Sequence, residues 1–302
     1  MKFTMGKATR EAYGEALRDL GRTNPNVVAL DADLSKSTMS RYFAQEFPQR
    51  FFNVGIAEAN MVGIAAGLAM CGKIPFASSF ACFVLCKAFD QLRMAVAYPN
   101  LNVKIVGSHG GISIGEDGAS QMAVEDVALA TALPGLTVVV PADEVEARAA
   151  VRAMAEHVGP VYMRVGRPKA PIVYEQGCDF ALGKAIRLRS GRDVTLIANG
   201  LLVARALEAA DALAEQGIEA RVLDMATVKP LDEAAVLAAA QETRGIVVAE
   251  EHLLHGGLGS AVAMAVGRLH PAPLAFVSIG DRYAESGTPE ELLHKYGLTA
   301  SD

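Results

Sequence analysis

The sequence predicts an α/β protein made of two sequential domains with mainly parallel sheets flanked by helices. The chain has 302 residues, a length typical of two domains. Half of the residues are hydrophobic, Ala and Gly are abundant and Trp is absent, a composition that favours close packing of helices on sheets. Short apolar runs alternate with stretches of helical period, which is typical of parallel strands covered on both faces.

The first domain is predicted over residues 1–170. Its strands are short runs rich in β-branched and aromatic residues, at 26–30, 51–55, 74–78, 102–107, 135–141 and 159–165. The helices are the stretches between them with apolar residues at helical spacing, at 7–21, 58–71, 80–97, 122–132 and 143–157.

The pattern changes after residue 165. Prolines, glycines and charges in 166–193 predict a linker, assigned to 171–190, followed by a leading strand pair. The second domain is predicted over 191–302, where strand-like runs again alternate with helical stretches. Its strands are expected at 193–200, 219–225, 245–251 and 274–280, and its helices at 201–217, 231–243 and 257–269.

Composition also excludes some classes of function. The net charge is −6, and no run of Lys or Arg forms a stripe for nucleic acid. The longest apolar run, Met61–Cys71, is too short for a bilayer, and the N-terminus lacks the pattern of a secretory signal. We therefore expect no nucleic-acid or membrane partner and a cytoplasmic location. The four cysteines form no CxxC motif and are interpreted as reduced thiols, although Cys82 and Cys86 share a helical face.

Glu58 is the single acid in the stretch from Asn53 to Met70, where an apolar helix follows a strand. A first-turn carboxylate can bond free N–H groups and the helix dipole. Burial would raise its pKa and the helix N-terminus would lower it. The residues alone leave a capping role and a functional role open.

Two further segments suit a ligand site. Phe80 and Phe83 lie three residues apart on a predicted helix, which is typical of a core but also of a flat slot for a planar ring. The Gly-rich loop 107–126 follows a strand end, where α/β proteins bind ligands. The polar residues of this loop are His109, Asp117 and Gln121.

Two arginines, Arg10 and Arg164, lie near element ends and could bind phosphate as planar forks. Ser35 or Ser37 could cap a helix after the strand 26–30. The HxxH pattern beginning at His252 fits a metal template poorly, and the sequence has no P-loop, HExxH or nucleophile elbow. We therefore assign no metal ligand to this chain.

Seven motifs occur in order along almost the whole chain: DADLS, VGIAEAN, SSFACF, GSHGGISIGEDGASQ, VPAD, VKPLD and EEH…GGLG. As a set they resemble the C-terminal half of transketolase, its pyrimidine-binding domain followed by its C-terminal domain. The length resembles the C-terminal subunit of a split transketolase. This resemblance implies thiamine diphosphate-dependent transfer of a two-carbon ketol unit from a ketose phosphate to an aldose phosphate, in pentose phosphate metabolism.

The resemblance also implies roles for residues near the cofactor. Glu58 matches the glutamate that bonds N1′ of the aminopyrimidine and so promotes loss of the proton at C2 of the thiazolium ring. Phe80 and Phe83 match the aromatic slot for the pyrimidine. Asp33 matches an acid that approaches the cofactor.

A second set of implied roles concerns the substrate. Asp117 matches an acid that recognises a substrate hydroxyl, and Gln121 stands where bacterial and yeast-like relatives have histidine. Hydrogen bonding by Gln121 is therefore expected more than proton transfer. The implied catalytic residues are Glu58, His109 and Gln121. The residues that align with the sugar-phosphate site are Arg10, Ser37, His109 and Arg164.

One family motif is missing: the GDG and distant Asn that hold the metal and diphosphate. The resemblance therefore implies a partner, the N-terminal transketolase subunit, which would supply Mg²⁺ or Ca²⁺ ligands in an α2β2 assembly. Gly63 and Gly67 have GxxxG spacing and could permit close helix packing. The alternatives are the beta subunit of a 2-oxo acid dehydrogenase decarboxylase, a non-catalytic transketolase-like partner, and a nucleotide-binding module.

Overall fold

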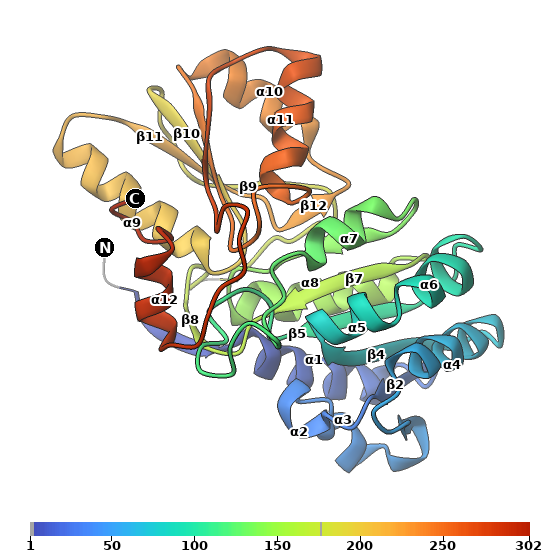
Figure 1. Ribbon diagram of the computed structural model, residues 1–302. Coiled ribbons are helices and arrows are strands. Elements are labelled where there is room, and N and C mark those ends of the chain that lie inside the picture. The colour runs from blue at the N-terminus through green and yellow to red at the C-terminus, as the bar shows by residue number, and fades with distance from the viewer. Residues whose placement is uncertain (1–2, 176) are drawn as a thin grey trace.

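The computed structural model describes residues 3–175 and 177–302. Its N-terminal part is built on a seven-stranded sheet of order β12-β6-β7-β5-β4-β2-β3 (Figure 1). All neighbours in this sheet are parallel except the β12–β6 pair. The strands are β2 (Val27–Asp31), β3 (Phe51–Asn53), β4 (Ile74–Phe80), β5 (Lys104–Ser108), β6 (Thr137–Val139), β7 (Val161–Val165) and β12 (Thr227–Lys229).

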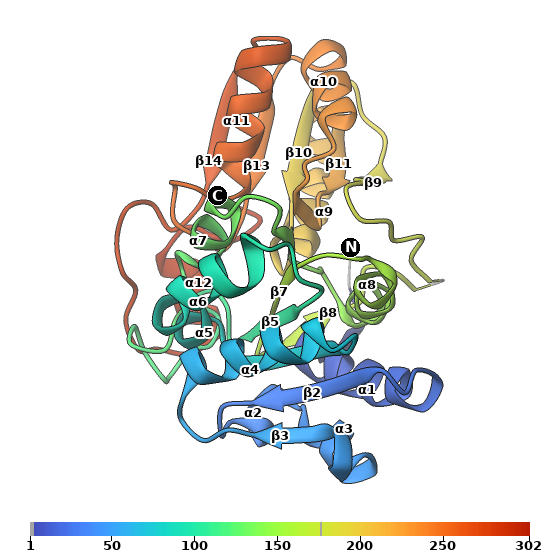
Figure 2. The same ribbon diagram turned by 90° about the vertical axis from the view of Figure 1, so that its right-hand side faces the viewer.

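Helices cover both faces of this sheet (Figure 2). One face packs on α1 (Thr9–Thr23), α3 (Arg41–Glu46) and α8 (Glu144–Glu156). The other packs on α4 (Glu58–Met70), α5 (Ala81–Lys87) and α7 (Asp126–Ala132). The shorter elements are α2 (Ser35–Thr38), a 3-10 turn (Pro48–Arg50), α6 (Phe89–Gln91) and a π-helical segment (Leu92–Ala97).

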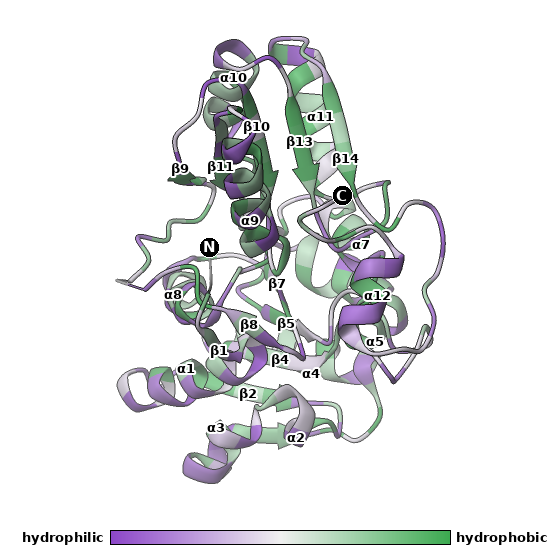
Figure 3. Ribbon diagram, turned by 90° about the vertical axis from the view of Figure 1, so that its left-hand side faces the viewer, coloured by the Kyte–Doolittle hydropathy of each residue, from purple (hydrophilic) through white to green (hydrophobic). Residues whose placement is uncertain are grey.

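The C-terminal part has a five-stranded sheet of order β14-β13-β10-β11-β9, in which only β9 is antiparallel to its neighbour. Its strands are hydrophobic in Figure 3, because both faces of the sheet pack against other elements. The strands are β9 (Ile186–Arg189), β10 (Val194–Ala198), β11 (Ala220–Asp224), β13 (Ile246–Ala249) and β14 (Leu274–Val277). The helices are α9 (Leu202–Glu215), α10 (Glu233–Glu242), α11 (Leu258–Leu269) and α12 (Pro289–Lys295).

One hydrophobic cluster runs through both domains. It joins Val127 and Leu133 of α7 and its following turn to Met225, Val228 and Val262 of the C-terminal part. All of these side chains are almost fully buried. The two domains are therefore packed against each other over a shared apolar core. This packing holds residues of both halves next to each other at the domain boundary.

The predicted fold class is confirmed, with three local corrections. The leading strand pair of the linker is wrong, because β8 (Lys169–Pro171) pairs with β1 (Met5–Ala8) in a separate two-stranded sheet and only β9 joins the second domain. The predicted helix 80–97 is interrupted at Ala88, which has φ −116° and ψ 18°, and after it α6 continues directly into the π-helical segment. The third correction is β12, a strand of the C-terminal half that extends the N-terminal sheet.

The sequence analysis also missed α12. Thr288 accepts a hydrogen bond from the N–H of Glu291, whose carboxylate bonds back to Thr288, and Pro289 stands at the first helical position. This is a capping box with an N1 proline, which the letters TPEE contain. Within the described ranges, each helix is too short or too polar to cross a membrane.

Candidate active site

The predicted cofactor residues follow strands that end at one edge of the N-terminal sheet. Asp33 follows β2, Glu58 follows β3, Phe80 ends β4 and His109 follows β5. Parallel neighbours present their carboxyl ends at the same edge, where α/β proteins bind ligands. Local backbone supports this placement, because Asp33 and His109 both have positive φ, 66° and 61°, so their side chains leave the strand direction at once.

Glu58 is the first residue of α4 and is only 3% exposed. The Lys87 ammonium lies 3.2 Å from Oε1 and 3.4 Å from Oε2 of Glu58. Lys87 is itself 48% exposed, so the buried acid depends on a lysine that reaches in from the surface. The sequence analysis missed Lys87, which stands at the last turn of α5.

Aromatic rings lie beside this acid. The Phe80 and Phe83 ring centroids are 5.4 Å apart with planes inclined by 15°. The His109 ring stacks on Phe80 with centroids 3.8 Å apart. Lys87 Nζ lies 4.1 Å from the centroid of Phe83. A flat apolar surface next to a buried carboxylate fits an aminopyrimidine, which needs stacking on its faces and a hydrogen bond at one ring nitrogen.

His109 joins the aromatic group to a basic one. Arg10 Nη1 lies 3.2 Å from His109 Nε2 and 2.8 Å from the carbonyl oxygen of Ser37. Because arginine only donates, Nε2 accepts, so Nδ1 carries the proton and donates to Ser108 Oγ at 2.9 Å. Burial lowers the pKa of His109 to about 3, helped by the charges of Arg10 and Arg167. His109 is thus a neutral hydrogen-bonding residue at ordinary pH.

The other predicted residues are placed as follows. Asp33 Oδ1 accepts a hydrogen bond from Asn53 Nδ2 at 3.0 Å, and Asn53 Oδ1 accepts from the N–H groups of Asp33 and Gly55 at 3.1 Å. Asp117 is exposed on the Gly-rich loop, close enough for its charge to act on Arg10. Gln121 is half-buried, and its carbonyl oxygen accepts from Cys82 Sγ at 3.2 Å.

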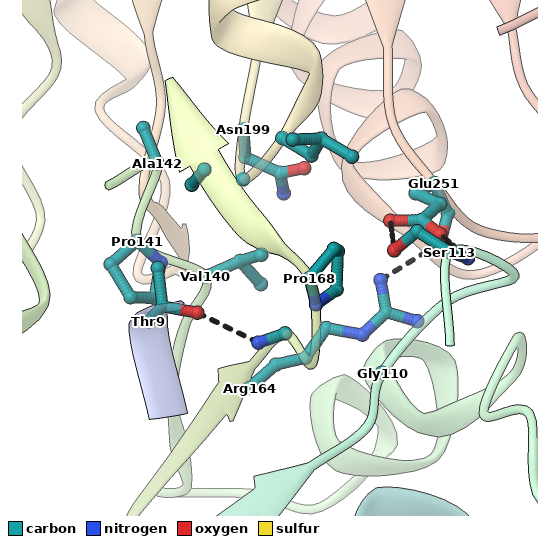
Figure 4. A pocket seen from close by; sticks show the side chains of 14 residues that line it. Thr9, Gly110, Ser113, Val140, Pro141, Ala142, Arg164, Pro168, Asn199 and Glu251 are labelled. Atoms are coloured by element: carbon teal, nitrogen blue, oxygen red, sulfur yellow. Dashed lines mark hydrogen bonds between the residues drawn. The ribbon is translucent and has the colours of Figure 1, made fainter. Parts of the chain in front are cut away.

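Arg164, the other arginine predicted as a phosphate contact, is bonded to a carboxylate and to two carbonyl groups of this chain. It is 5% exposed and donates to both carboxylate oxygens of Asp126, at 3.0 and 2.7 Å. It also donates to the carbonyl oxygens of Ala123 and Glu251. Its guanidinium is therefore committed to the contact between the domains (Figure 4).

Arg167, three residues later, is the arginine that the sequence analysis missed. Burial lowers the pKa of Arg10, and the charge of Arg167 lowers it further. The same charge contributes to the lowered pKa of His109, so the three groups are close. Arg167 is 35% exposed and is paired with Glu116 at 2.9 Å. The signal was present, since β7 ends at Val165 and Arg167 comes just after the strand's carboxyl end.

Two family models match this chain. Residues 5–172 match the family model described as "Transketolase, pyrimidine binding domain", and residues 183–302 match "Transketolase, C-terminal domain". The two matches cover nearly the whole chain and define the pyrimidine-binding and C-terminal domains of a transketolase-type protein, a class that implies thiamine diphosphate. The chain belongs to the transketolase family.

Individual relatives narrow the match to one half of the family's sequence. The "Putative transketolase C-terminal section" of Methanocaldococcus jannaschii is 46% identical over 97% of this chain and 92% of its own length. The "6-deoxy-6-sulfo-D-fructose transketolase subunit SqwH" of Clostridium sp. is 45% identical over 97% and 91%. A solved structure titled "Split gene transketolase, inactive beta4 tetramer" superposes with a TM-score of 0.89 at 50% identity, covering 98% of this chain and 95% of that one.

Proposed function

We propose that this chain is the C-terminal subunit of a two-chain transketolase. With its partner it transfers a two-carbon ketol unit from a ketose phosphate to an aldose phosphate, an activity of the EC 2.2.1.1 type that we place in cytoplasmic pentose phosphate metabolism. The observation that carries the proposal is Glu58, a buried acid beside the stacked rings of Phe80 and Phe83. Thiamine diphosphate, when bound, supplies the nucleophilic carbon.

Four residues of this chain would contact the pyrimidine ring of the cofactor. Glu58 would hold the pyrimidine by a hydrogen bond at its ring nitrogen, and Phe80 and Phe83 would stack against the ring. Asp33, next to the Glu58 helix start through Asn53 and Gly55, would line the same side. A carboxylic acid in such a site exchanges its proton with the bound heterocycle because water is excluded.

The basic group would bind the anionic end of the sugar. Arg10 and Arg167 bring two positive charges beside neutral His109, with Ser37 next to Arg10. Asp117 would bond a substrate hydroxyl, and Gln121 would donate or accept one further bond. A guanidinium pair accepts a phosphate or a sulfonate, which suits the sulfonated sugar named in one relative's title.

The proposed partner surface lies next to Glu58. From Met61 onward helix α4 carries no polar side chain, and positions 63 and 67 face open space. Ile56, Met70 and Tyr98 around it are 78, 77 and 82% exposed. Large exposed apolar patches mark contact sites. We propose that this surface packs against an N-terminal transketolase subunit that holds the cofactor diphosphate through Mg²⁺ or Ca²⁺, in an α2β2 assembly.

Reconstitution tests the proposal. The chain alone should fold, self-associate and lack ketol-transfer activity. Addition of an N-terminal transketolase section, thiamine diphosphate and Mg²⁺ should restore activity that saturates near one partner per chain. The assay should compare a phosphorylated ketose donor with a 6-sulfo analogue. Activity of the isolated chain, free of host enzyme, would contradict the two-chain site, and activity with a lipoyl-protein acceptor would favour the 2-oxo acid dehydrogenase alternative.

A further inference from the structure

The C-terminal domain touches the Gly-rich loop that carries His109 and Asp117. The main contact is Glu251, which follows β13 and is 7% exposed. Its Oε1 accepts a hydrogen bond from the Ser113 N–H at 2.5 Å, and its Oε2 accepts from Ser113 Oγ at 3.2 Å. Figure 4 shows Glu251 and Ser113 facing each other across the domain boundary, with Arg164 beside them.

The backbone of the loop is shaped around this carboxylate. Gly111 has φ of +80°, and a Cβ atom at that position would collide with the carboxyl group of Glu251. The carbonyl oxygen of Glu251 accepts from Arg164 Nη1 at 2.8 Å. Arg164 in turn bonds Asp126, where the loop ends and α7 begins. One residue of the C-terminal domain is thus tied to the middle and, through Arg164, to the end of the loop.

Further contacts of the same domain continue along the loop. The N–H of Leu253 donates to the carbonyl oxygen of Val124 at 2.9 Å. Gly115 and Gly118, both with positive φ, lie against Pro289 and Ser286. The side chains of Ile112, Ile114 and Met122 share a hydrophobic cluster with residues of α9 and α12. The apolar half of the loop therefore has its core in the other domain.

We propose that Glu251 is a positioning residue for the proposed transfer reaction, and that it fixes the loop so that His109 and Asp117 face the substrate. This inference rests on the proposed function for its effect on turnover, while the clamp itself is a statement about the loop. Glu251 touches neither the aromatic slot nor Glu58 in the contacts described above. Its loss should therefore change substrate kinetics and leave cofactor affinity unchanged.

The test compares two neighbouring acids of the same domain. Glu251→Ala removes the clamp, and Glu251→Gln keeps one acceptor for the Ser113 N–H. Glu250→Gln is the matched control, because Glu250 accepts the N–H groups of Leu258 and Gly259 at 2.8 Å within its own domain. Hydrogen–deuterium exchange of peptides covering 109–121 is measured on the full chain. Cofactor affinity, kcat and KM are measured on the reconstituted pair.

Glu251→Ala should speed exchange in 109–121 about tenfold or more and lower kcat/KM about 10- to 100-fold, the effect of leaving buried donors unpaired. Glu251→Gln should restore most of the slow exchange and most of kcat/KM. Glu250→Gln should leave the exchange rate of 109–121 and kcat/KM unchanged. Unchanged loop exchange in Glu251→Ala would overturn the clamp and leave the proposed function standing. If the loop exchanges faster in Glu251→Ala but the wild-type reconstituted pair shows no ketol transfer, the clamp stands and the proposed function is overturned. Should Glu251→Ala fail to fold, Ser113→Ala decides by the same exchange measurement, with an increase expected and none overturning the proposal.

Discussion

Glu58 and Glu251 are both buried acids near the proposed site, yet they are bonded in different ways. Glu58 is paired with Lys87, a side chain that is 48% exposed and can swing away. Glu251 is bonded by the backbone and hydroxyl of Ser113 across the domain boundary, next to Arg164. Long exposed side chains form replaceable contacts, whereas buried backbone contacts do not exchange with water. The contact of Glu58 with Lys87 can therefore open, whereas the contact of Glu251 with Ser113 holds the loop of the proposed substrate site in place.

The largest expected effect comes from removing the acid function on the cofactor side. Glu58→Gln keeps the size of the side chain but cannot exchange a proton with the pyrimidine. General acid–base roles are worth about 10²–10⁴ in rate, so turnover of the reconstituted pair should fall at least about 100-fold. Exchange of the C2 proton of the bound cofactor, followed by NMR, is the direct measurement. Wild-type exchange in this variant would remove Glu58 from the mechanism.

The second prediction separates the two arginines of the segment after β7. Arg167→Ala removes a proposed anion contact worth about 1.5–3 kcal/mol, or roughly 10- to 100-fold in kcat/KM. The loss should fall on phosphorylated substrates and spare unphosphorylated analogues. Parallel kcat/KM measurements on the two substrate classes test it.

Arg164→Ala is the matched variant, and it breaks a buried pair with Asp126. Such losses cost about 3–5 kcal/mol, so this chain should melt at a lower temperature. Any remaining activity should be reduced equally for both substrate classes. Selective loss of phosphorylated substrates in Arg164→Ala, but not in Arg167→Ala, would reverse the two assignments.

A smaller effect is expected at Lys87. The proposed pyrimidine would bond Glu58 and stack on Phe83, which are the two groups that Lys87 now contacts. Lys87→Met should therefore strengthen cofactor binding by the reconstituted pair, by about fivefold, since Lys87 is half exposed and ion pairs open to solvent contribute about 1 kcal/mol or less. Fluorescence titration with thiamine diphosphate checks this, with Lys73→Met as a remote control. Weaker binding in Lys87→Met would mean that Lys87 remains in place beside the bound cofactor.

The last prediction is of a different kind, a pH dependence of stability at the domain boundary away from both regions. Glu146 of α8 and Asp224 of β11 are fully buried, and Glu146 Oε1 and Asp224 Oδ1 find no donor among the described residues. A proton shared by the two carboxyls satisfies both. Burial, with the charge of Asp143, raises the pKa of Asp224 to about 7, and burial with the charge of Asp224 raises that of Glu146. Tyr174 donates to Asp224 at 2.7 Å, and Cys178 lies close by.

The sign follows from proton binding. The folded state keeps a proton that the unfolded carboxyls, with ordinary pKa values of 3.8 and 4.5, release. Stability should therefore fall as the pH rises from about 4 to about 7. Glu146→Gln should flatten this part of the Tm-against-pH curve. An identical slope in wild type and variant would show that the pair does not titrate in this range.

The sequence was sufficient for the parts of the site that depend on position along one strand or helix. Asp33, Glu58, Phe80 and His109 each stand where a strand ends, so alternation of strands and helices was enough to place them at one edge. Lys87 and Glu251 were missed because their roles depend on which side chain they meet in space. Arg167 was missed for the same reason, and only packing shows that Asp126 binds the Arg164 guanidinium.

The fold shows the same limit. The helices and parallel strands follow from hydrophobic period, but β12 carries no local mark of the sheet that it joins. Its partner is fixed by the hydrogen bond from the Val140 N–H to the Ala226 carbonyl oxygen at 2.7 Å, a contact across more than 80 residues of chain.

That added strand bears on how the polypeptide can be made and cut. On a ribosome, β12 is made only when residue 229 has been added. The first sheet therefore lacks its edge strand while the N-terminal domain is being synthesised. A fragment ending near residue 172, the limit of the first family match, would leave β6 as a bare edge with unpaired N–H and C=O groups. Such edges pair with other chains. The N-terminal half expressed alone is therefore expected to self-associate through β6, so the two halves fold as one unit.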